Sequence, residues 1–208
     1  MSIVKICGIT DEPGRDICLD AGADILGFNI YPGSKRRVSI RSLEKLITPE
    51  IREKSAVVGV DLSLREWEEI VRLVNPGFIQ LHGSGDIPLI RKVKERLPGV
   101  KVIKKVVIEE RKKFGGYLDA ADFILCDYSG KKPGGSGKSF EWEKLSLLSP
   151  GIRSRFFVAG GITPENVEEA LGYGVYGVDA ATGSEVSPGK KSQEKVSELV
   201  RKVKNYEL

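Results

Sequence analysis

Apolar and polar residues alternate along the chain in short strand-like runs, and the segments between them have apolar positions at helical spacing. The runs predict strands over Ile3–Cys7, Ile25–Phe28, Ala56–Val60, Phe78–Leu81, Val100–Val107, Phe123–Asp127, Phe156–Val158 and Gly177–Ala181. The segments between them predict helices over Pro13–Ala21, Arg41–Ile47, Leu64–Val74, Ile87–Leu97, 109–121, Trp142–Leu148, Pro164–Leu171 and Gln193–Val203. Local signals agree, since Ser63 can cap the third helix, Pro98-Gly99 can end the fourth and Thr163-Pro164-Glu165 can open the seventh.

Strands that alternate with helices favour parallel pairing through right-handed crossovers. Eight such units in 208 residues predict a compact (β/α)₈ TIM barrel that occupies residues 1–208 as a single domain. An open doubly wound sheet is the alternative, but its dinucleotide-binding form carries G-x-G-x-x-G after the first strand. Here the first strand continues into Cys7-Gly8-Ile9-Thr10, which lacks that pattern.

Side chains of a strand alternate between its two faces, so the apolar neighbours indicate which polar residues point into the barrel. Val4 and Ile6 suit the outer face, which leaves Lys5 and Cys7 inside. The same alternation directs Asp127 and Asp179 inward, and Lys5 with Asp179 is a candidate buried ion pair. Cys7 and Asp127 end their strands, and the carboxyl ends of barrel strands are where active sites form.

Composition narrows the function classes. The net charge of +4 is too small and dispersed to indicate nucleic-acid binding, and no apolar run approaches the roughly 18 residues of a membrane span. The three cysteines, Cys7, Cys18 and Cys126, are far apart and odd in number, so a secreted disulfide framework is not expected. With His82 as the only histidine, a multi-histidine metal site is excluded. From the cysteine pattern and the lack of a membrane span we expect a cytoplasmic protein.

Glycine-rich turns follow the seventh and eighth predicted strands. Gly160-Gly161 lies in the first turn and Gly183-Ser184 in the second, where barrels often bind phosphate through backbone N–H groups. Ordinary tight turns are the alternative. Two such turns at these barrel positions favour a phosphorylated small-molecule ligand.

Two further loops carry candidate binding residues. The loop after Asp127 contains Gly134-Gly135-Ser136-Gly137, which suits either a lid over substrate or a flexible spacer, and it lacks the spacing of a P-loop. The basic run that ends in Arg36-Arg37 is a solvated face or an anion clamp, because an arginine fork matches a carboxylate.

These motifs together resemble the phosphoribosylanthranilate isomerase family of tryptophan biosynthesis. The resemblance covers nearly the whole chain and is carried, in family order, by Lys5-Ile6-Cys7-Gly8-Ile9-Thr10, Ala23-Asp24-Ile25-Leu26-Gly27-Phe28, Tyr31-Pro32-Gly33-Ser34-Lys35-Arg36, Val58-Gly59-Val60, Gln80-Leu81-His82-Gly83, Asp127, Gly134-Gly135-Ser136-Gly137-Lys138, Gly160-Gly161, Pro164-Glu165-Asn166-Val167, Asp179, Gly183, Glu185 and Pro188-Gly189-Lys190-Lys191. The chain departs from the family pattern at Asp61, at Ala159 and at Ala180-Ala181-Thr182, which affects the expected details of phosphate contacts.

The resemblance implies an Amadori rearrangement of N-(5-phosphoribosyl)anthranilate to 1-(2-carboxyphenylamino)-1-deoxyribulose 5-phosphate. It assigns Cys7 as the general base, Asp127 as the general acid and Arg36 as the residue that binds the anthranilate carboxylate. The glycine turns would bind the phosphate, and no metal or organic cofactor is needed.

Other roles stay open for the neighbouring residues. Lys5 can lower the pKa of the Cys7 thiol or form the ion pair with Asp179. His82 can carry a proton, although a hydrogen-bonding residue at the strand end is the simpler interpretation. The sequence does not distinguish a monomer from a homodimer.

Three rival functions fit the sequence less well. A sister isomerase of histidine biosynthesis has an aspartate where this chain has Cys7. A pentulose-phosphate epimerase needs a metal held by several histidines. A non-catalytic binder of phosphoribosyl ligands would not need both Cys7 and Asp127.

Overall fold

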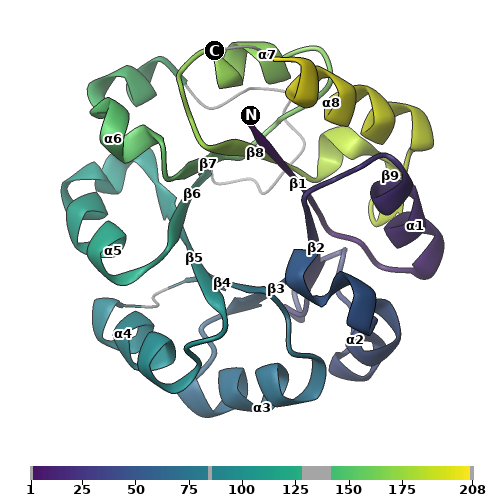
Figure 1. Ribbon diagram of the computed structural model, residues 1–208, viewed down its shortest axis with the longest axis vertical. Helices are drawn as coiled ribbons and strands as arrows, with labels where there is room; N and C mark the ends of the chain where they lie inside the picture. The colour runs from purple at the N-terminus through teal and green to yellow at the C-terminus, as the bar shows by residue number, and fades with distance from the viewer. Residues whose placement is uncertain (1, 84–85, 128–141, 207–208) are drawn as a thin grey trace.

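Eight parallel strands form a closed barrel in the computed structural model, which describes residues 2–83, 86–127 and 142–206 (Figure 1). The strands are β1 (Ile3–Cys7), β2 (Ile25–Asn29), β3 (Ser55–Val60), β4 (Phe78–His82), β5 (Lys101–Val107), β6 (Phe123–Asp127), β7 (Phe156–Val158) and β8 (Gly177–Ala180). Each strand pairs with the next, and β8 closes the barrel on β1 with Lys5 opposite Asp179. The predicted (β/α)₈ barrel is confirmed.

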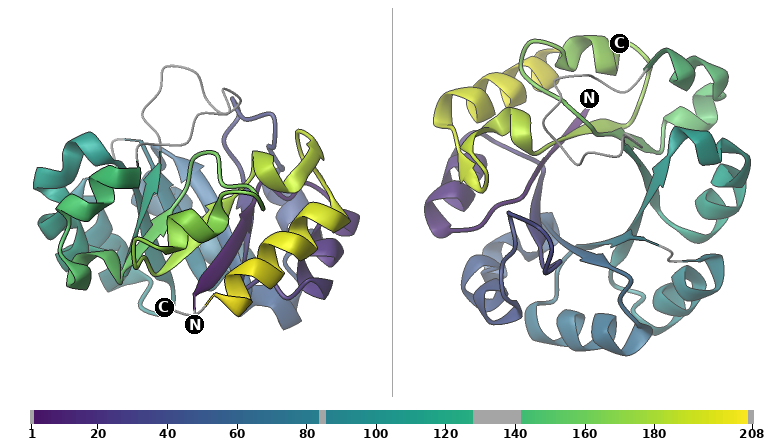
Figure 2. Two further views of the ribbon diagram at one scale, coloured as in Figure 1. Left: turned by 90° about the horizontal axis from the view of Figure 1, so that it is seen from above. Right: turned by 180° about the vertical axis from the view of Figure 1, so that it is seen from behind.

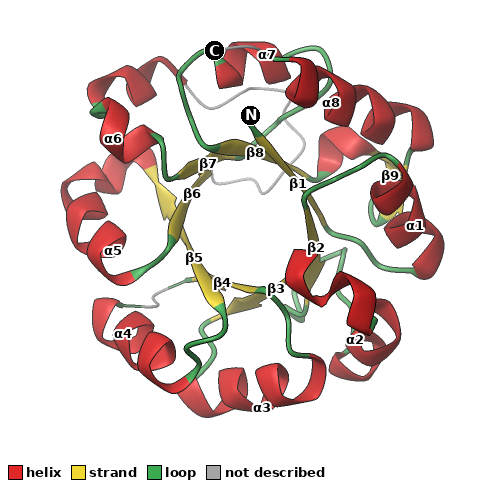
Figure 3. Ribbon diagram, in the orientation of Figure 1, coloured by secondary structure: helices red, strands yellow, loops and turns green. Residues whose placement is uncertain are grey.

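The helices form an outer layer around the strands, as the view coloured by secondary structure and the side view show (Figures 3 and 2). They are α1 (Glu12–Asp20), α2 (Ile40–Leu46), α3 (Leu64–Val74), α4 (Ile87–Arg96), α5 (Phe114–Ala120), α6 (Pro150–Arg153), α7 (Val167–Leu171) and α8 (Gln193–Asn205). Shorter 3₁₀ segments cover Pro49–Lys54, Ile108–Lys113, Trp142–Leu147 and Thr182–Ser184. None of the helices in the described part of the chain is long and apolar enough to cross a membrane.

Most predicted elements are observed within one or two residues, and Ser63 caps α3 in a reciprocal box with Glu66. Three helix predictions are wrong in part. The predicted helix over 109–121 is divided into a 3₁₀ segment (Ile108–Lys113) and α5. The segment that starts at Trp142 is a 3₁₀ helix, and α7 begins only at Val167 rather than at Pro164. In α7 the preceding residues form a turn, Asn166 has φ −118°, and its side chain accepts a hydrogen bond from the Thr163 N–H at 2.8 Å.

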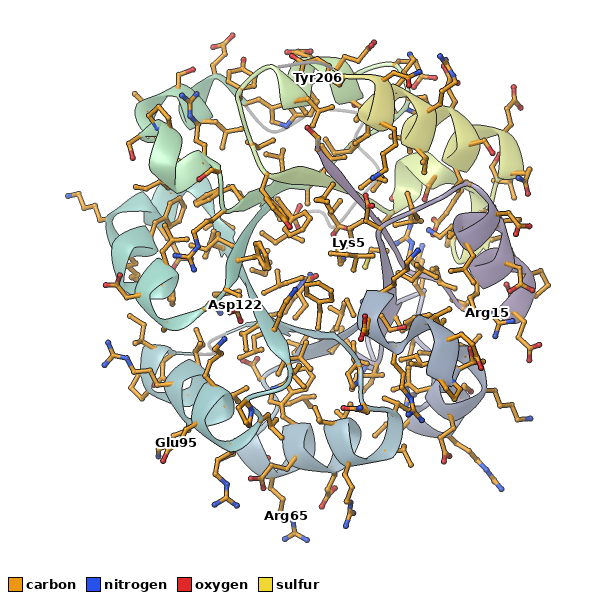
Figure 4. The ribbon with its side chains drawn as sticks, in the orientation of Figure 1. Lys5, Arg15, Arg65, Glu95, Asp122 and Tyr206 are labelled. Atoms are coloured by element: carbon orange, nitrogen blue, oxygen red, sulfur yellow. The ribbon has the colours of Figure 1, made fainter. Side chains whose placement is uncertain are left out.

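Hydrophobic residues pack on both faces of the barrel strands. Ile25, Phe78, Leu125 and other residues fill the inside of the barrel, whereas Val4, Ile6, Cys126 and Val178 pack between strands and helices. The predicted alternation of faces is therefore correct. Figure 4 shows Lys5 directed to the barrel centre, as expected for a residue between Val4 and Ile6.

A short antiparallel hairpin follows the eighth strand and was not predicted. It consists of β9 (Glu185–Ser187) and β10 (Lys190–Lys191), with Gly189 in the turn at φ +84°. The carbonyl oxygen of Gly189 accepts a hydrogen bond from the Thr10 hydroxyl at 2.7 Å. The hairpin therefore packs against the loop between β1 and α1.

Candidate active site

Cys7 lies at the carboxyl end of β1, where its side chain is almost fully buried. Gly27 is its register partner on β2, and a β-carbon on Gly27 would lie only 2.8 Å from the Cys7 sulfur. The absence of a side chain at Gly27 therefore creates the space that the thiol occupies.

A charged cluster surrounds the thiol inside the barrel. Lys5 Nζ lies 2.9 Å from Asp179 Oδ1, so the candidate ion pair is present, and both residues are buried. Burial would by itself lower the pKa of Lys5, but the Asp179 carboxylate raises it above its usual value, so the ammonium stays charged. Burial raises the pKa of the Cys7 thiol, although the positive charges of Lys5 and Lys191 oppose that shift.

Arg36 lies over the turn that follows Cys7, because a β-carbon on Gly8 would be 2.3 Å from Arg36 Cδ, in the flexible part of that side chain. Its Nε and Nη2 atoms donate to Glu185 at 2.7–3.0 Å, and Nη2 also donates to the Thr182 hydroxyl at 3.0 Å. The fork that the sequence assigned to a substrate carboxylate is thus engaged by Glu185. In the described part of the chain Nη1 donates to no protein group, so it is the atom available to a ligand.

The turn after β7 has the backbone form that suits an anion. Gly160 and Gly161 adopt φ values of +83° and +80°, and neither N–H donates a hydrogen bond to another described residue. Asn166 holds this turn, because its Nδ2 donates to the Gly161 carbonyl at 2.9 Å. As far as the described residues go, both N–H groups are available to an anion.

The turn after β8 touches the turn after β7. A β-carbon on Gly183 would lie 2.0 Å from the Ile162 carbonyl oxygen, so only glycine allows this approach. Ser184 is buried, and its hydroxyl donates to the Ala181 carbonyl at 2.7 Å. The structure brings together the two turns that the sequence singled out.

Asp127 ends β6, is partly buried and pairs in register with Val107. Because all eight strands are parallel, Cys7 and Asp127 lie at the same end of the barrel, on strands separated by β7 and β8. The candidate lid residues Gly134, Gly135, Ser136 and Gly137 lie outside the described residues.

Comparison with known proteins identifies the family. The family model for N-(5'-phosphoribosyl)anthranilate (PRA) isomerase matches residues 4–202. The chain belongs to the PRA isomerase family.

Relatives of this family match over almost their whole length. The chain is 34% identical to the N-(5'-phosphoribosyl)anthranilate isomerase of Bradyrhizobium sp. (strain ORS 278), with 96% of this chain and 94% of the relative covered. It is 36% identical to that of Aquifex aeolicus, with 97% and 98% covered. The crystal structure of the Thermotoga maritima enzyme superposes with a TM-score of 0.85 at 31% identity, covering 99% of this chain and 100% of that one.

A second solved structure of a phosphoribosyl anthranilate isomerase contains reduced 1-(o-carboxyphenylamino)-1-deoxyribulose 5-phosphate. It superposes with a TM-score of 0.81 at 29% identity over 99% of this chain and 100% of that one.

His82, which belongs to one of the family motifs, ends β4 beside Gln80, and their Nε2 atoms lie 2.6 Å apart. Burial, with the neighbouring positive charges of Lys105, Lys5 and Lys104, lowers the pKa of His82 to about 3. The imidazole is therefore neutral near pH 7. A neutral ring fits the hydrogen-bonding role that the sequence favours, and the contact with Gln80 is of that kind.

Asp61, the first departure from the family pattern, lines a cavity of about 200 Å³ with His82 and Trp67. Asp61 has φ +51°, and a β-carbon on Gly83 would lie 2.2 Å from its carboxylate. Its side chain thus lies against the end of β4 and belongs to the barrel end that carries the site. Among the described residues, no cluster of three or more His, Cys, Asp or Glu side chains could hold a metal ion.

We expect His82→Gln to flatten the dependence of stability on pH between about pH 6.5 and pH 4. The unfolded chain binds a proton at His82 in this range, whereas the folded protein keeps it neutral down to about pH 3. The contribution of His82 to the free energy of unfolding is therefore fully present above pH 6.5. Below that pH it falls by about 1.4 kcal/mol per pH unit. Because the chain has one histidine, urea unfolding of both proteins isolates its contribution. Equal slopes would contradict a half-buried imidazole that stays neutral in the folded protein.

Sequence reasoning named Glu185, Lys191 and Asn166 among the family motifs but assigned none of them a role. Glu185 and Lys191 come from the unpredicted hairpin, and Asn166 was placed inside a helix. The signal for the hairpin was present, since two short polar runs flank Pro188-Gly189, a turn dipeptide.

Proposed function

We propose that this chain catalyses the isomerisation of N-(5-phosphoribosyl)anthranilate to 1-(2-carboxyphenylamino)-1-deoxyribulose 5-phosphate in tryptophan biosynthesis. The observation that carries the proposal is the arrangement of three kinds of group at one end of the barrel. Cys7 ends β1 with Arg36 over the turn that follows it, glycine turns follow β7 and β8, and Asp127 ends β6. This matches a substrate with a carboxylate at one end and a phosphate at the other.

The reaction needs one acid and one base at separate positions. Asp127 protonates the ring oxygen of the ribose, and the ring opens to a Schiff base between C1 and the anthranilate nitrogen. Cys7, as thiolate, removes the proton from C2 to give an enolamine. Protonation at C1 and loss of the C2 hydroxyl proton then give the ketose, so the rearrangement moves protons without a redox partner.

The charges around Cys7 support its role as the base. Lys5 and Lys191 favour the thiolate, and they oppose the effect of burial. Cys18 and Cys126 lie outside the barrel, and burial raises the pKa of each to about 12, so neither can act as a base near pH 7.

The direct test is turnover of freshly prepared phosphoribosylanthranilate by the purified wild-type chain. The fluorescence of the substrate should disappear with saturation kinetics, and mass spectrometry should find a product of unchanged mass. Release of free anthranilate at the uncatalysed rate, with no isomer, would refute the proposal and favour a non-catalytic binder.

Arg36→Met should weaken substrate binding by about 1.5–3 kcal/mol, the range for a charge-assisted hydrogen bond. This corresponds to an increase in KM of about 10-fold to 150-fold. Arg36→Lys should recover only part of the loss, because an ammonium cannot bind Glu185 with two parallel hydrogen bonds and also present Nη1 to the ligand.

The exposed neighbour Arg37 gives a matched control, since Arg37→Met removes one positive charge from the same loop. Arg37→Met should keep the wild-type KM. Wild-type KM in Arg36→Met would remove Arg36 from the binding site.

A further inference from the structure

Lys191 is a fully buried cation at the edge of the candidate site. Its side chain has 0% exposure, and it lies on β10, outside the barrel. Nζ lies 2.6 Å from the carbonyl oxygen of Cys7, 3.0 Å from the Ser184 hydroxyl and 3.1 Å from Glu185 Oε1. Cys7 is the proposed base on β1, Ser184 lies in the turn after β8, and Glu185 binds Arg36.

The three contacts use the whole donor capacity of the ammonium, which has three N–H groups. Lys191 therefore has no donor left for a substrate, and any effect on the reaction passes through its partners. A buried cation without such partners would be strongly destabilising, so the geometry of the three acceptors is tightly constrained.

Glu185 connects Lys191 to Arg36. Its side chain is 2% exposed and accepts hydrogen bonds from both cations. Burial would raise the pKa of Glu185, but the hydrogen bonds from Arg36 and the charge of Lys191 lower it, so the carboxylate stays ionised. Without Lys191, Glu185 would have only Arg36 as a cationic partner among the described residues.

We propose that Lys191 is a positioning residue of this active site: its ammonium fixes the end of β1, the Ser184 turn and the Arg36–Glu185 pair relative to one another. The inference rests on the proposed function for its catalytic consequence. Its link to Cys7 can be tested without any turnover.

The Cys7 thiol provides that independent readout. The charged groups that face it are Lys5 on β1, Asp179 on β8, Arg36 after β2 and Lys191 on β10. Burial and Asp179 raise the pKa of Cys7, whereas Lys5 and Lys191 lower it. Removing the Lys191 charge should therefore raise this pKa. The thiolate then forms at higher pH.

The test compares Lys191→Met with Lys190→Met. Lys190 is the adjacent lysine of the same strand, but its side chain is 64% exposed and forms an ion pair with Asp11. For each variant, kcat and KM are measured with phosphoribosylanthranilate. The rate of Cys7 alkylation by iodoacetamide is measured against pH, with the modified peptide identified by mass spectrometry.

Lys191→Met should lower kcat/KM by about 10-fold to 100-fold, the scale of a small misplacement of reacting groups, and should move the alkylation profile to higher pH. Lys191→Arg, which keeps the charge but not the length, should retain the wild-type alkylation profile. Lys190→Met should match wild type in every measurement.

A folded Lys191→Met with wild-type kinetics and a wild-type alkylation profile would overturn the proposal. If Lys191→Met does not fold, Lys191→Gln is used in its place, and failure of both to fold would assign the lysine to stability alone and also overturn it. Absence of turnover in wild type would refute the proposed function, while the alkylation profiles would still decide the link between Lys191 and Cys7.

Discussion

Replacing Cys7 by serine should lower kcat by about 100-fold or more while KM stays close to its wild-type value. Serine fits the space beside Gly27 but is a far weaker base than a thiol. The carboxylate and phosphate contacts are unchanged, so binding persists. In wild type, kcat/KM should rise with pH above neutrality, because burial raises the pKa of Cys7 and the thiolate fraction is small at pH 7.

Cys18→Ser is the matched control for this change. Cys18 is also a buried free cysteine, but it packs between α1 and the barrel. The Cys18→Ser change should lower the free energy of unfolding without a comparable loss of kcat. A folded Cys7→Ser variant that keeps more than about a tenth of wild-type kcat would show that Cys7 is not the base.

Asp127→Asn should reduce kcat on a similar scale, by about 100-fold or more. The amide keeps the shape of the side chain at the end of β6 but cannot donate a carboxyl proton to the ring oxygen. We expect that Cys7 cannot replace it, because β7 and β8 lie between β1 and β6.

Asp119→Asn removes an exposed carboxylate from α5, the helix that precedes β6, and should leave kcat unchanged. Near-wild-type kcat in Asp127→Asn would transfer the acid role to another group. A large increase in KM alone would instead make Asp127 a binding residue.

The barrel and the inward residues could be predicted because they follow from local patterns. The alternation of β1 alone directs Lys5 and Cys7 inward, and this holds for any sheet in which Val4 and Ile6 face the helices. The glycine turns could be located for a similar reason, since each directly follows a strand.

The partners of Arg36 could not be predicted from such patterns. Glu185 is 149 positions further along the chain, and its contact depends on how the hairpin after β8 folds back toward β1. The same holds for Lys191, whose contact with the Cys7 carbonyl spans 184 positions. The helix start at Val167 was missed because it depends on the backbone of Asn166, whose φ of −118° lies well away from the usual helical value.

The central claim is that one ligand spans the barrel end from the glycine turns to Arg36, with Cys7 and Asp127 on either side of its sugar. A crystal structure of this chain with reduced 1-(o-carboxyphenylamino)-1-deoxyribulose 5-phosphate tests it directly. The account predicts the phosphate on the N–H groups of Gly160 and Gly183, and the carboxylate on Arg36 Nη1. A phosphate bound at the amino-terminal ends of the strands, or a carboxylate remote from Arg36, would contradict it.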